Sequence, residues 1–270
     1  MKHIFSSPSA ILLTILVVGA LLAPVLPLHD PLAMDISGRF AGPSASHWFG
    51  QDEYGRDVFA RLVFALRSAI LISGSAAVLS AIIGTAIGVA AGYVRGLSEA
   101  FAMRVMDIIL CFPPLLLAML AATLYGAGPQ TLVPVLALVF VPSFTRVAHA
   151  SVMTVRTMDY VDAVRLMGAP TSHILWRTIL PGIAGPLFVQ FSFVVAMSVV
   201  LESGLSYLGL GVLPPEPSLG MMVGAARATF LDEPWLLIAP CLLLTGVIIL
   251  LNAFCDHLRH LLDPRRSTGN

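Results

Sequence analysis

The sequence has little charge. Of its 270 residues, only 11% are Asp, Glu, Lys or Arg, whereas 57% are hydrophobic. Soluble domains carry roughly a quarter charged residues, so this composition excludes an ordinary water-facing surface and predicts a protein whose solvent is lipid. The formal net charge is zero and the cations are scattered along the chain. A nucleic-acid partner is therefore not expected.

Cysteine is also scarce. The three cysteines, Cys111, Cys241 and Cys255, lie in or beside apolar runs and lack the spacing of a metal site. We interpret them as small buried hydrophobic residues and expect no disulfide framework. His257 and His260 could share a helix face, but we interpret them as solvated, and no metal site is predicted.

Catalytic motifs are missing as well. The sequence contains no GxSxG, no HExxH and no GxxxxGK[ST] loop. An intramembrane hydrolase needs a nucleophile and a base within hydrogen-bond reach, and Ser206 has no histidine near it in the sequence. We therefore expect a protein that is not an enzyme and cannot hydrolyse ATP by itself. An intramembrane hydrolase and a channel that acts alone are the alternatives from other functional classes.

Long apolar runs are abundant. A membrane-spanning helix needs about 20 predominantly apolar residues, and the sequence predicts six such segments: 11–28, 69–92, 108–125, 132–148, 183–201 and 235–255. The fold class is therefore predicted as an all-α polytopic membrane protein with six transmembrane helices. The first segment has no small-x-small cleavage site, so we interpret it as a retained signal anchor.

The cations predict the orientation. With the N-terminus in the cytoplasm and six alternating helices, 10 Lys and Arg residues lie inside and 5 lie outside. Cytoplasmic loops are enriched in Lys and Arg, so both termini are expected in the cytoplasm. Residues 159–181 are then cytoplasmic, and the residues before the second span lie outside.

Three glycines, Gly84, Gly88 and Gly92, are spaced four apart in the second span. This spacing places small residues on one helix face and lets another helix approach closely. The partner helix belongs either to the same chain or to another subunit, and the sequence leaves both open.

The cytoplasmic stretch at 159–181, which ends in DAVRLMGAPTSHILWRTILP, is polar between apolar runs. It predicts a helix that begins with Asp159 and Asp162, a turn at Gly168, and a second short helix after Pro170. Either of the two residues after this proline is expected to cap the second helix. Apolar side chains of the stretch are available for a protein partner or for lipid headgroups: Val161, Val164, Leu166, Met167 and Trp176.

This stretch resembles the EAA loop of importer permeases of the ATP-binding-cassette class. The family pattern is Glu-Ala-Ala, three residues, Gly, about ten residues and Ile-Leu-Pro; here it reads Asp-Ala-Val at 162–164, Gly168, and Ile-Leu-Pro at 179–181. In that family the loop is the coupling helix, which docks into a groove of the ATPase subunit. The resemblance implies ATPase coupling by Asp162, Ala163, Arg165, Gly168, Ala169, Leu180 and Pro181.

Three further stretches narrow the family. GQDEYGRD at 50–57 resembles the GTDxxGRD element, ESGLSYLGLG at 202–211 resembles EaaLSFLGLG, and NAFCDHLRHLLDP at 252–264 resembles NxxGDxLRDxLDP. Gln51, Cys255 and His260 depart from these patterns. Over nearly the whole chain, the sequence resembles the second permease subunit of dipeptide, oligopeptide and nickel importers.

The resemblance implies a type I importer transmembrane domain at 69–264, after an anchor helix and periplasmic segment at 1–68 and before a tail at 265–270. It implies a bacterial inner membrane, a second homologous permease, two ATP-binding subunits that hold ATP and Mg, and a periplasmic or lipid-anchored substrate-binding protein. No cofactor is expected in this chain. Peptides are the favoured substrate class, and nickel or another small solute is the alternative.

Two groups of polar residues are further candidates. The outer element Asp52, Gly55, Arg56 and Asp57 is interpreted as a structural brace, with contact to a binding protein as the alternative.

An acid inside a membrane span is a candidate functional residue. Glu202, with Ser206 and Tyr207, is therefore a candidate for the translocation path or gate, and a packing role is the alternative. Asp107 is expected to pair with Arg104 on the inner side.

Overall fold

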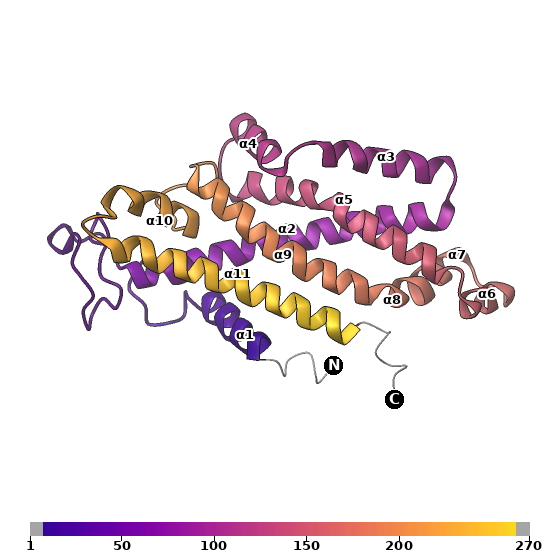
Figure 1. Cartoon of the computed structure of the whole chain (residues 1–270), viewed down its shortest axis with the longest axis horizontal. Coiled ribbons are helices and arrows are strands. Elements are labelled where there is room, and N and C mark those ends of the chain that lie inside the picture. Colours follow the sequence, from indigo (N-terminus) through magenta and orange to yellow (C-terminus); the bar gives the residue numbers. More distant parts are fainter. Residues whose placement is uncertain (1–7, 263–270) are drawn as a thin grey trace.

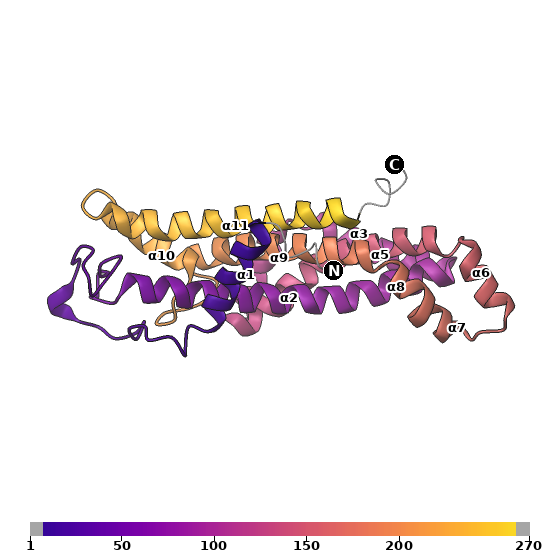
Figure 2. The same ribbon diagram turned by 90° about the horizontal axis from the view of Figure 1, so that it is seen from below.

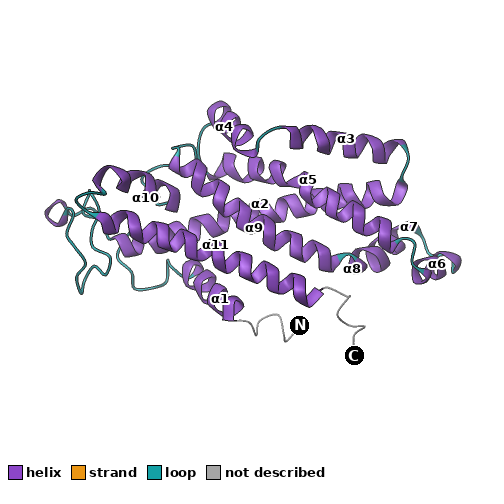
Figure 3. Cartoon of the chain, in the orientation of Figure 1, coloured by secondary structure: helices purple, strands orange, loops and turns teal. Residues whose placement is uncertain are grey.

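The computed structural model describes residues 8–262. Four long helices lie side by side along one axis: α2 (Val58–Val94), α5 (Pro129–Val155), α9 (Ala184–Tyr207) and α11 (Pro234–Leu262) (Figure 1). No strand occurs in residues 8–262 (Figure 3). The all-α prediction is therefore confirmed for this part of the chain, and the tail predicted at 265–270 lies outside it.

Helix α1 (Pro8–Leu21) is short and runs obliquely across the bundle (Figure 2). It packs against α2 and α11. At 14 residues it is shorter than the predicted span at 11–28, and turns continue beyond it. An oblique helix of this length does not by itself reach across a hydrocarbon core of about 30 Å.

The prediction of one continuous helix at 108–125 is wrong. The chain there makes two helices, α3 (Leu97–Cys111) and α4 (Pro114–Tyr125), which are bent by 82° at the break between them. Phe112 precedes a proline and is extended, because the ring of Pro113 clashes with a helical residue before it. Within residues 8–262, four helices are long and apolar enough to cross a membrane, or five if this bent pair is one span.

The two ends of the bundle carry different short elements (Figure 1). One end holds the connection between α1 and α2, with η1 (Ile36–Gly38), and α10 (Leu219–Ala226) with η3 (Arg227–Thr229). The other end holds α6 (Asp159–Leu166), α7 (Thr171–His173), the π-helix η2 (Ile174–Ile179) and α8 (Leu180–Gly182). The residues predicted to be periplasmic and cytoplasmic therefore lie at opposite ends.

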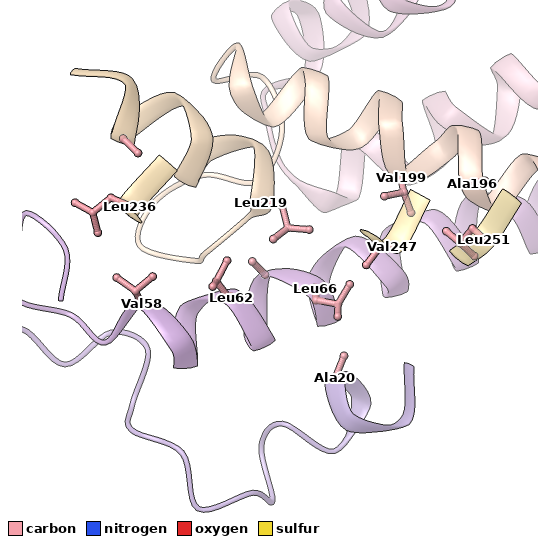
Figure 4. Packing of buried hydrophobic residues seen from close by; sticks show 12 residues of the cluster. Ala20, Val58, Leu62, Leu66, Ala196, Val199, Leu219, Leu236, Val247 and Leu251 are labelled. Atoms are coloured by element: carbon pink, nitrogen blue, oxygen red, sulfur yellow. The ribbon is translucent and has the colours of Figure 1, made fainter. Parts of the chain in front are cut away.

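A buried apolar cluster joins the first end of the bundle to its middle (Figure 4). Side chains from α1, α2, α9, α10 and α11 meet in it, among them Ala20, Leu66, Val199, Leu219 and Val247. Because these helices are distant in the sequence, the cluster fixes α10 and the oblique α1 against the long helices. It thereby holds the start of α2 in place.

The three glycines of α2 pack against α5 of the same chain. A Cβ at Gly84 would lie 2.6 Å from the carbonyl oxygen of Val141, and one at Gly88 would lie 2.5 Å from that of Thr145. A Cβ at Gly92 would lie 3.0 Å from the Cβ of Val152. Of the two alternatives that the sequence left open, packing within the chain is the one observed, because a Cβ at Gly84 or Gly88 would overlap the backbone of α5.

Replacing Gly88 with Ala is expected to destabilise the bundle by about 1–3 kcal/mol, the usual cost of overpacking. The new methyl group would meet the backbone of α5, which cannot move aside without shifting the helix. The measurement is thermal unfolding of the purified protein in detergent. Gly74→Ala, in the same helix, is the matched control. A Cβ at Gly74 would have no atom of the described residues within 4 Å outside its own stretch of helix. Equal melting temperatures for the two variants would contradict the close packing.

Candidate functional site

The inner connection between α5 and α9 begins as the sequence predicts. Asp159 and Asp162 lie in the first turn of α6, where carboxylates offset the positive end of the helix dipole. Arg165 donates a hydrogen bond of 2.8 Å from Nη1 to Asp162 Oδ1. Gly168 then takes a φ of +77° and donates from its backbone N–H to the carbonyl of Arg165. The helix and the glycine turn are therefore confirmed.

The second half of this connection differs from the prediction. Pro170 occupies the position before α7, and neither Thr171 nor Ser172 makes a side-chain capping bond there within the described residues. The helix has only three residues before the backbone widens into the π-helix η2. Pro181 lies in α8, which follows η2 directly. The chain thus stays helical almost continuously into α9.

One face of this connection is buried against the bundle. Val161, Ile174, Ile179 and Ile183 join the ends of α5 in an apolar cluster. Val161 is fully buried, so the expectation that it is available to a partner is wrong. Val161 packs with Val152 and Val155 at the end of α5. The cluster holds α6, η2 and α8 in a fixed position relative to the long helices.

The other face is exposed and partly apolar. Leu166 is 88% exposed, Met167 77% and Trp176 70%. Side chains of this size and polarity are unfavourable in water when they stand together. Among the predicted coupling residues, Ala169 and Leu180 pack against the buried cluster. The others are exposed: Asp162, Ala163, Arg165, Gly168 and Pro181.

At the opposite end, the outer element forms the predicted brace around Asp52. Its Oδ1 accepts the backbone N–H groups of Tyr54 and Arg56 at 2.8 and 3.0 Å. Its Oδ2 accepts Arg56 Nε at 2.8 Å and lies 3.4 Å from Arg61 Nε. One carboxylate therefore holds two arginines that are both largely buried.

The remaining residues of the element fasten it to its surroundings. Asp57 caps α2 by accepting the backbone N–H of Ala60 at 2.8 Å. Gly55 has a φ of +71°, and a Cβ there would overlap the backbone of Asp35. Hydrogen bonds from the hydroxyl and the backbone N–H of Ser37 lower the pKa of the exposed Asp35 carboxyl. The element is thus built into the loop rather than projecting from it.

A pocket of about 500 Å³ opens between this element and α10. Its walls combine apolar side chains with the two arginines, and they include Phe40, Tyr54, Arg56, Arg61, Met221 and Met222. This hollow lies beside the element that the sequence predicts to be periplasmic, and it is compatible with contact to a protein partner, the alternative that the sequence left open for the element.

Glu202 lies inside the chain rather than on a surface. It is fully buried and accepts hydrogen bonds from Ser206 Oγ at 2.8 Å and from Ser203 Oγ at 3.3 Å. Ser206 Oγ in turn accepts the backbone N–H of Val212 at 3.2 Å. The group therefore ties the end of α9 to the loop that follows it. This placement favours the packing role for Glu202 and Ser206, whereas Tyr207 is 41% exposed and stays a candidate for the path.

Two glycines allow this packing. A Cβ at Gly211 would overlap Ser206, and a Cβ at Gly220 would overlap the backbone of Ser203. The loop after α9 and the first turn of α10 therefore lie directly on the end of α9. In the sequence, the small residues around Glu202 were the signal that something approaches it closely.

Two polar contacts between α3 and α5 were not predicted from the sequence. Arg146 Nη2 lies 2.6 Å from Asp107 Oδ1, so the expected pairing of Asp107 with Arg104 is wrong. His149 Nε2 lies 2.7 Å from Glu99 Oε1. The two contacts lie about one helix turn apart on α5, at Arg146 and His149, and about two turns apart on α3, at Asp107 and Glu99. The signal available was the presence of Arg146 and His149 at the end of an otherwise apolar run.

Comparison with known proteins adds a family and a fold. Residues 84–268 match the family described as binding-protein-dependent transport system inner membrane component. A Brucella abortus biovar 1 protein named for a peptide transport system permease is 37% identical over 98% of this chain and 89% of its own length.

Two further relatives carry more specific names. The glutathione transport system permease protein GsiD of Pectobacterium atrosepticum is 34% identical over 83% of this chain and 74% of its own. The probable D,D-dipeptide transport system permease protein DdpC of Escherichia coli is 34% identical over 95% of this chain and 86% of its own.

A solved structure shares the fold. A chain from inward-facing structures of the MetNI methionine ABC transporter superposes with a TM-score of 0.55 at 15% identity. The superposition covers 75% of this chain and 98% of that one. The helical arrangement described above is thus one that an ABC transporter also adopts.

Proposed function

From the premise that this chain belongs to the binding-protein-dependent transport system inner membrane component family, we propose that it is one permease subunit of an ATP-driven importer of peptides. The observation that carries the proposal is the similarity over 98% of the chain to a protein named for a peptide transport system permease. The apolar helices fit a multi-pass protein of the bacterial inner membrane. The chain is a transport component rather than an enzyme.

The substrate class is inferred from the relatives. Their names specify peptides, D,D-dipeptides and glutathione. None of these three names specifies nickel, so peptides are the substrate class that we propose for this chain. An intramembrane hydrolase and a channel acting alone gain no support from the family.

Six crossings are part of the proposal. They are α1 with the turns that follow it, α2, the bent pair of α3 and α4, α5, α9 and α11. Support comes from the opposite placement of the outer element and the α6 connection along the bundle (Figure 1). An alternating path through six crossings starts and ends on the same side, and the excess of Lys and Arg on the side of the α6 connection favours the cytoplasm for both termini.

The partners are inferred from the family and from the fold that the chain shares with an ABC transporter. A second homologous permease would face this one, and two ATP-binding subunits would hold ATP and Mg on the cytoplasmic side. A periplasmic or lipid-anchored binding protein would deliver the substrate at the outer face, near Asp52 and the 500 Å³ pocket. ATP can shift the equilibrium between inward-open and outward-open states only through contacts that differ between them.

The α6 connection is suited to carry those contacts. Its buried face is fixed to the ends of α5 and α9 by Val161, Ile174 and Ile179. Its exposed face carries Leu166 and Met167. A force applied at the exposed face is therefore transmitted to the long helices through packed side chains rather than through a loose loop.

Transport in cells tests this function. An amino-acid auxotroph that lacks its own peptide importers would express this chain with the genes beside it. Growth on peptides that contain the required amino acid and uptake of labelled nickel would be measured in parallel. We expect growth on peptides that is lost when the ATPase genes are removed. Growth that survives their removal would favour a channel, and nickel uptake without peptide use would favour the nickel alternative.

A further inference from the structure

Three potential ligands of a metal ion meet on the outer face of the chain. His29 follows α1, His47 lies in the loop before the outer element, and Asp57 caps the start of α2. His47 Nδ1 is 3.0 Å from Asp57 Oδ1, and His29 Nδ1 is 3.9 Å from Asp57 Oδ2. The two imidazole rings lie 4.8 Å apart between their centroids. Residues separated by many positions in the sequence are thus brought to one point.

The distances are near those that a metal requires. Zinc binds imidazole nitrogen and carboxylate oxygen at about 2.0–2.2 Å, so two of its tetrahedral ligands lie roughly 3.4 Å apart. The His47–Asp57 and His29–Asp57 separations fall on either side of this value, and all three ligand atoms lie within 4.8 Å of one another. Small rotations of the two rings would therefore close the site. His29 is 56% exposed, which leaves room for water as a further ligand.

The chemical types of these three ligands select a class of ion. Two imidazoles and one carboxylate suit zinc and its neighbours in the first transition row, whereas calcium and magnesium prefer oxygen ligands alone. The carboxylate also offsets the positive end of the α2 dipole, which would otherwise repel a cation. Because the same carboxylate also caps α2, we expect a site of moderate affinity rather than a permanently filled one.

The ligands are held in place by other contacts. Asp57 is 5% exposed, and its Oδ2 accepts the N–H of Ala60. Around His47, the backbone N–H donates to Ser44 Oγ at 3.0 Å, and the carbonyl accepts the N–H groups of Ser44 and Gly50. Such outer contacts orient ligands before an ion arrives and raise affinity. Two of the three ligands are therefore preorganised.

We propose that His29, His47 and Asp57 bind one divalent transition-metal ion, for which zinc is the probe of choice. The ion fastens the segment that leaves α1 to the beginning of α2. It thereby stiffens the outer loop that contains Asp52 and Arg56. The site is separate from the proposed transport function, because its ligands belong to the outer segment and a bound ion there need not move.

Zinc binding to the purified transporter tests the site. The full chain, with the subunits that stay bound to it and without a polyhistidine tag, would be titrated with Zn²⁺ in competition with a chromophoric chelator. We expect the wild type to bind one more equivalent than His29→Ala, or to bind it about tenfold more tightly. Asp57→Asn is expected to lose the same equivalent while keeping the helix cap, because Asn caps helices as well as Asp does.

Two controls make the result decisive. His173→Ala removes an exposed histidine at the opposite end and is expected to bind as the wild type does. Co²⁺ in place of Zn²⁺ is expected to give visible absorption bands that His29→Ala lacks. His29 is exposed, so its removal leaves the fold intact, which size-exclusion chromatography verifies. Equal zinc binding by the wild type, His29→Ala and Asp57→Asn would overturn the proposal, whether or not peptides are transported.

Discussion

Replacing Leu166 with Asp is expected to detach the ATP-binding subunits from the membrane complex while the helical bundle stays folded. Leu166 is 88% exposed at the end of α6, so its removal costs the chain little internal packing. A carboxylate in the centre of a protein interface leaves a buried charge without a partner. Residues at such centres commonly contribute 2 kcal/mol or more to binding, which corresponds to about a thirtyfold loss of affinity.

The measurement is the amount of ATPase retained when this chain is pulled down from membranes. Leu231→Asp is the matched control: Leu231 is 93% exposed, but it lies between η3 and α11 at the outer end. We expect the control to retain the ATPase and to support peptide uptake. Retention of the ATPase by Leu166→Asp, or equal losses in both variants, would mean that the exposed face of α6 rests on lipid headgroups instead.

Replacing Glu202 with Ala is expected to lower the free energy of unfolding by about 2–4 kcal/mol. The change creates a cavity in a fully buried position and leaves the hydroxyls of Ser203 and Ser206 without their acceptor. The loop after α9 depends on Ser206 through the N–H of Val212. Thermal unfolding in detergent, with parallel quantification of folded protein in membranes, measures the loss.

Glu202→Gln separates packing from a role in the path. Gln keeps the volume and one acceptor oxygen, so we expect it to recover most of the stability. If packing is the role of Glu202, peptide uptake per folded transporter is unchanged in Glu202→Gln. A Glu202→Gln variant that is as stable as the wild type but transports at least tenfold more slowly would contradict this and return Glu202 to the translocation path.

The inner connection illustrates how far local patterns reach. Asp162, Gly168 and Pro170 predicted a helix, a turn and a second helical stretch, because capping and turn chemistry depend on neighbouring residues alone. The same patterns could not tell which apolar side chains face inward. Val161 and Leu166 are similar in polarity, yet one is buried against α5 and the other is exposed. That choice depends on where the end of α5 lies.

The prediction of the third span, at 108–125, was limited in a similar way. Apolar composition predicted one helix at 108–125, and the two prolines at 113 and 114 marked a weak point in it. How far the chain turns there is set by the packing of α4 against α5 and α9. Hydropathy measures the preference of a segment for lipid and carries no information about its direction. The 82° bend therefore could not be predicted from it.

The sequence by itself determined that this chain is a helical membrane protein and which family it resembles. It also determined which end of the bundle we propose to face the cytoplasm. These properties follow from composition, charge asymmetry and short motifs, all of which are local. Only the tertiary structure decided that Gly84 and Gly88 face α5 and that Glu202 is fully buried. It also decided that Arg146 pairs with Asp107, and that His29 and His47 meet Asp57. The contacts of the glycines, of Arg146 and of the two histidines join different elements of the chain, and Glu202 is buried because the loop after α9 and helix α10 pack against the end of α9. All of these depend on how the helices pack together.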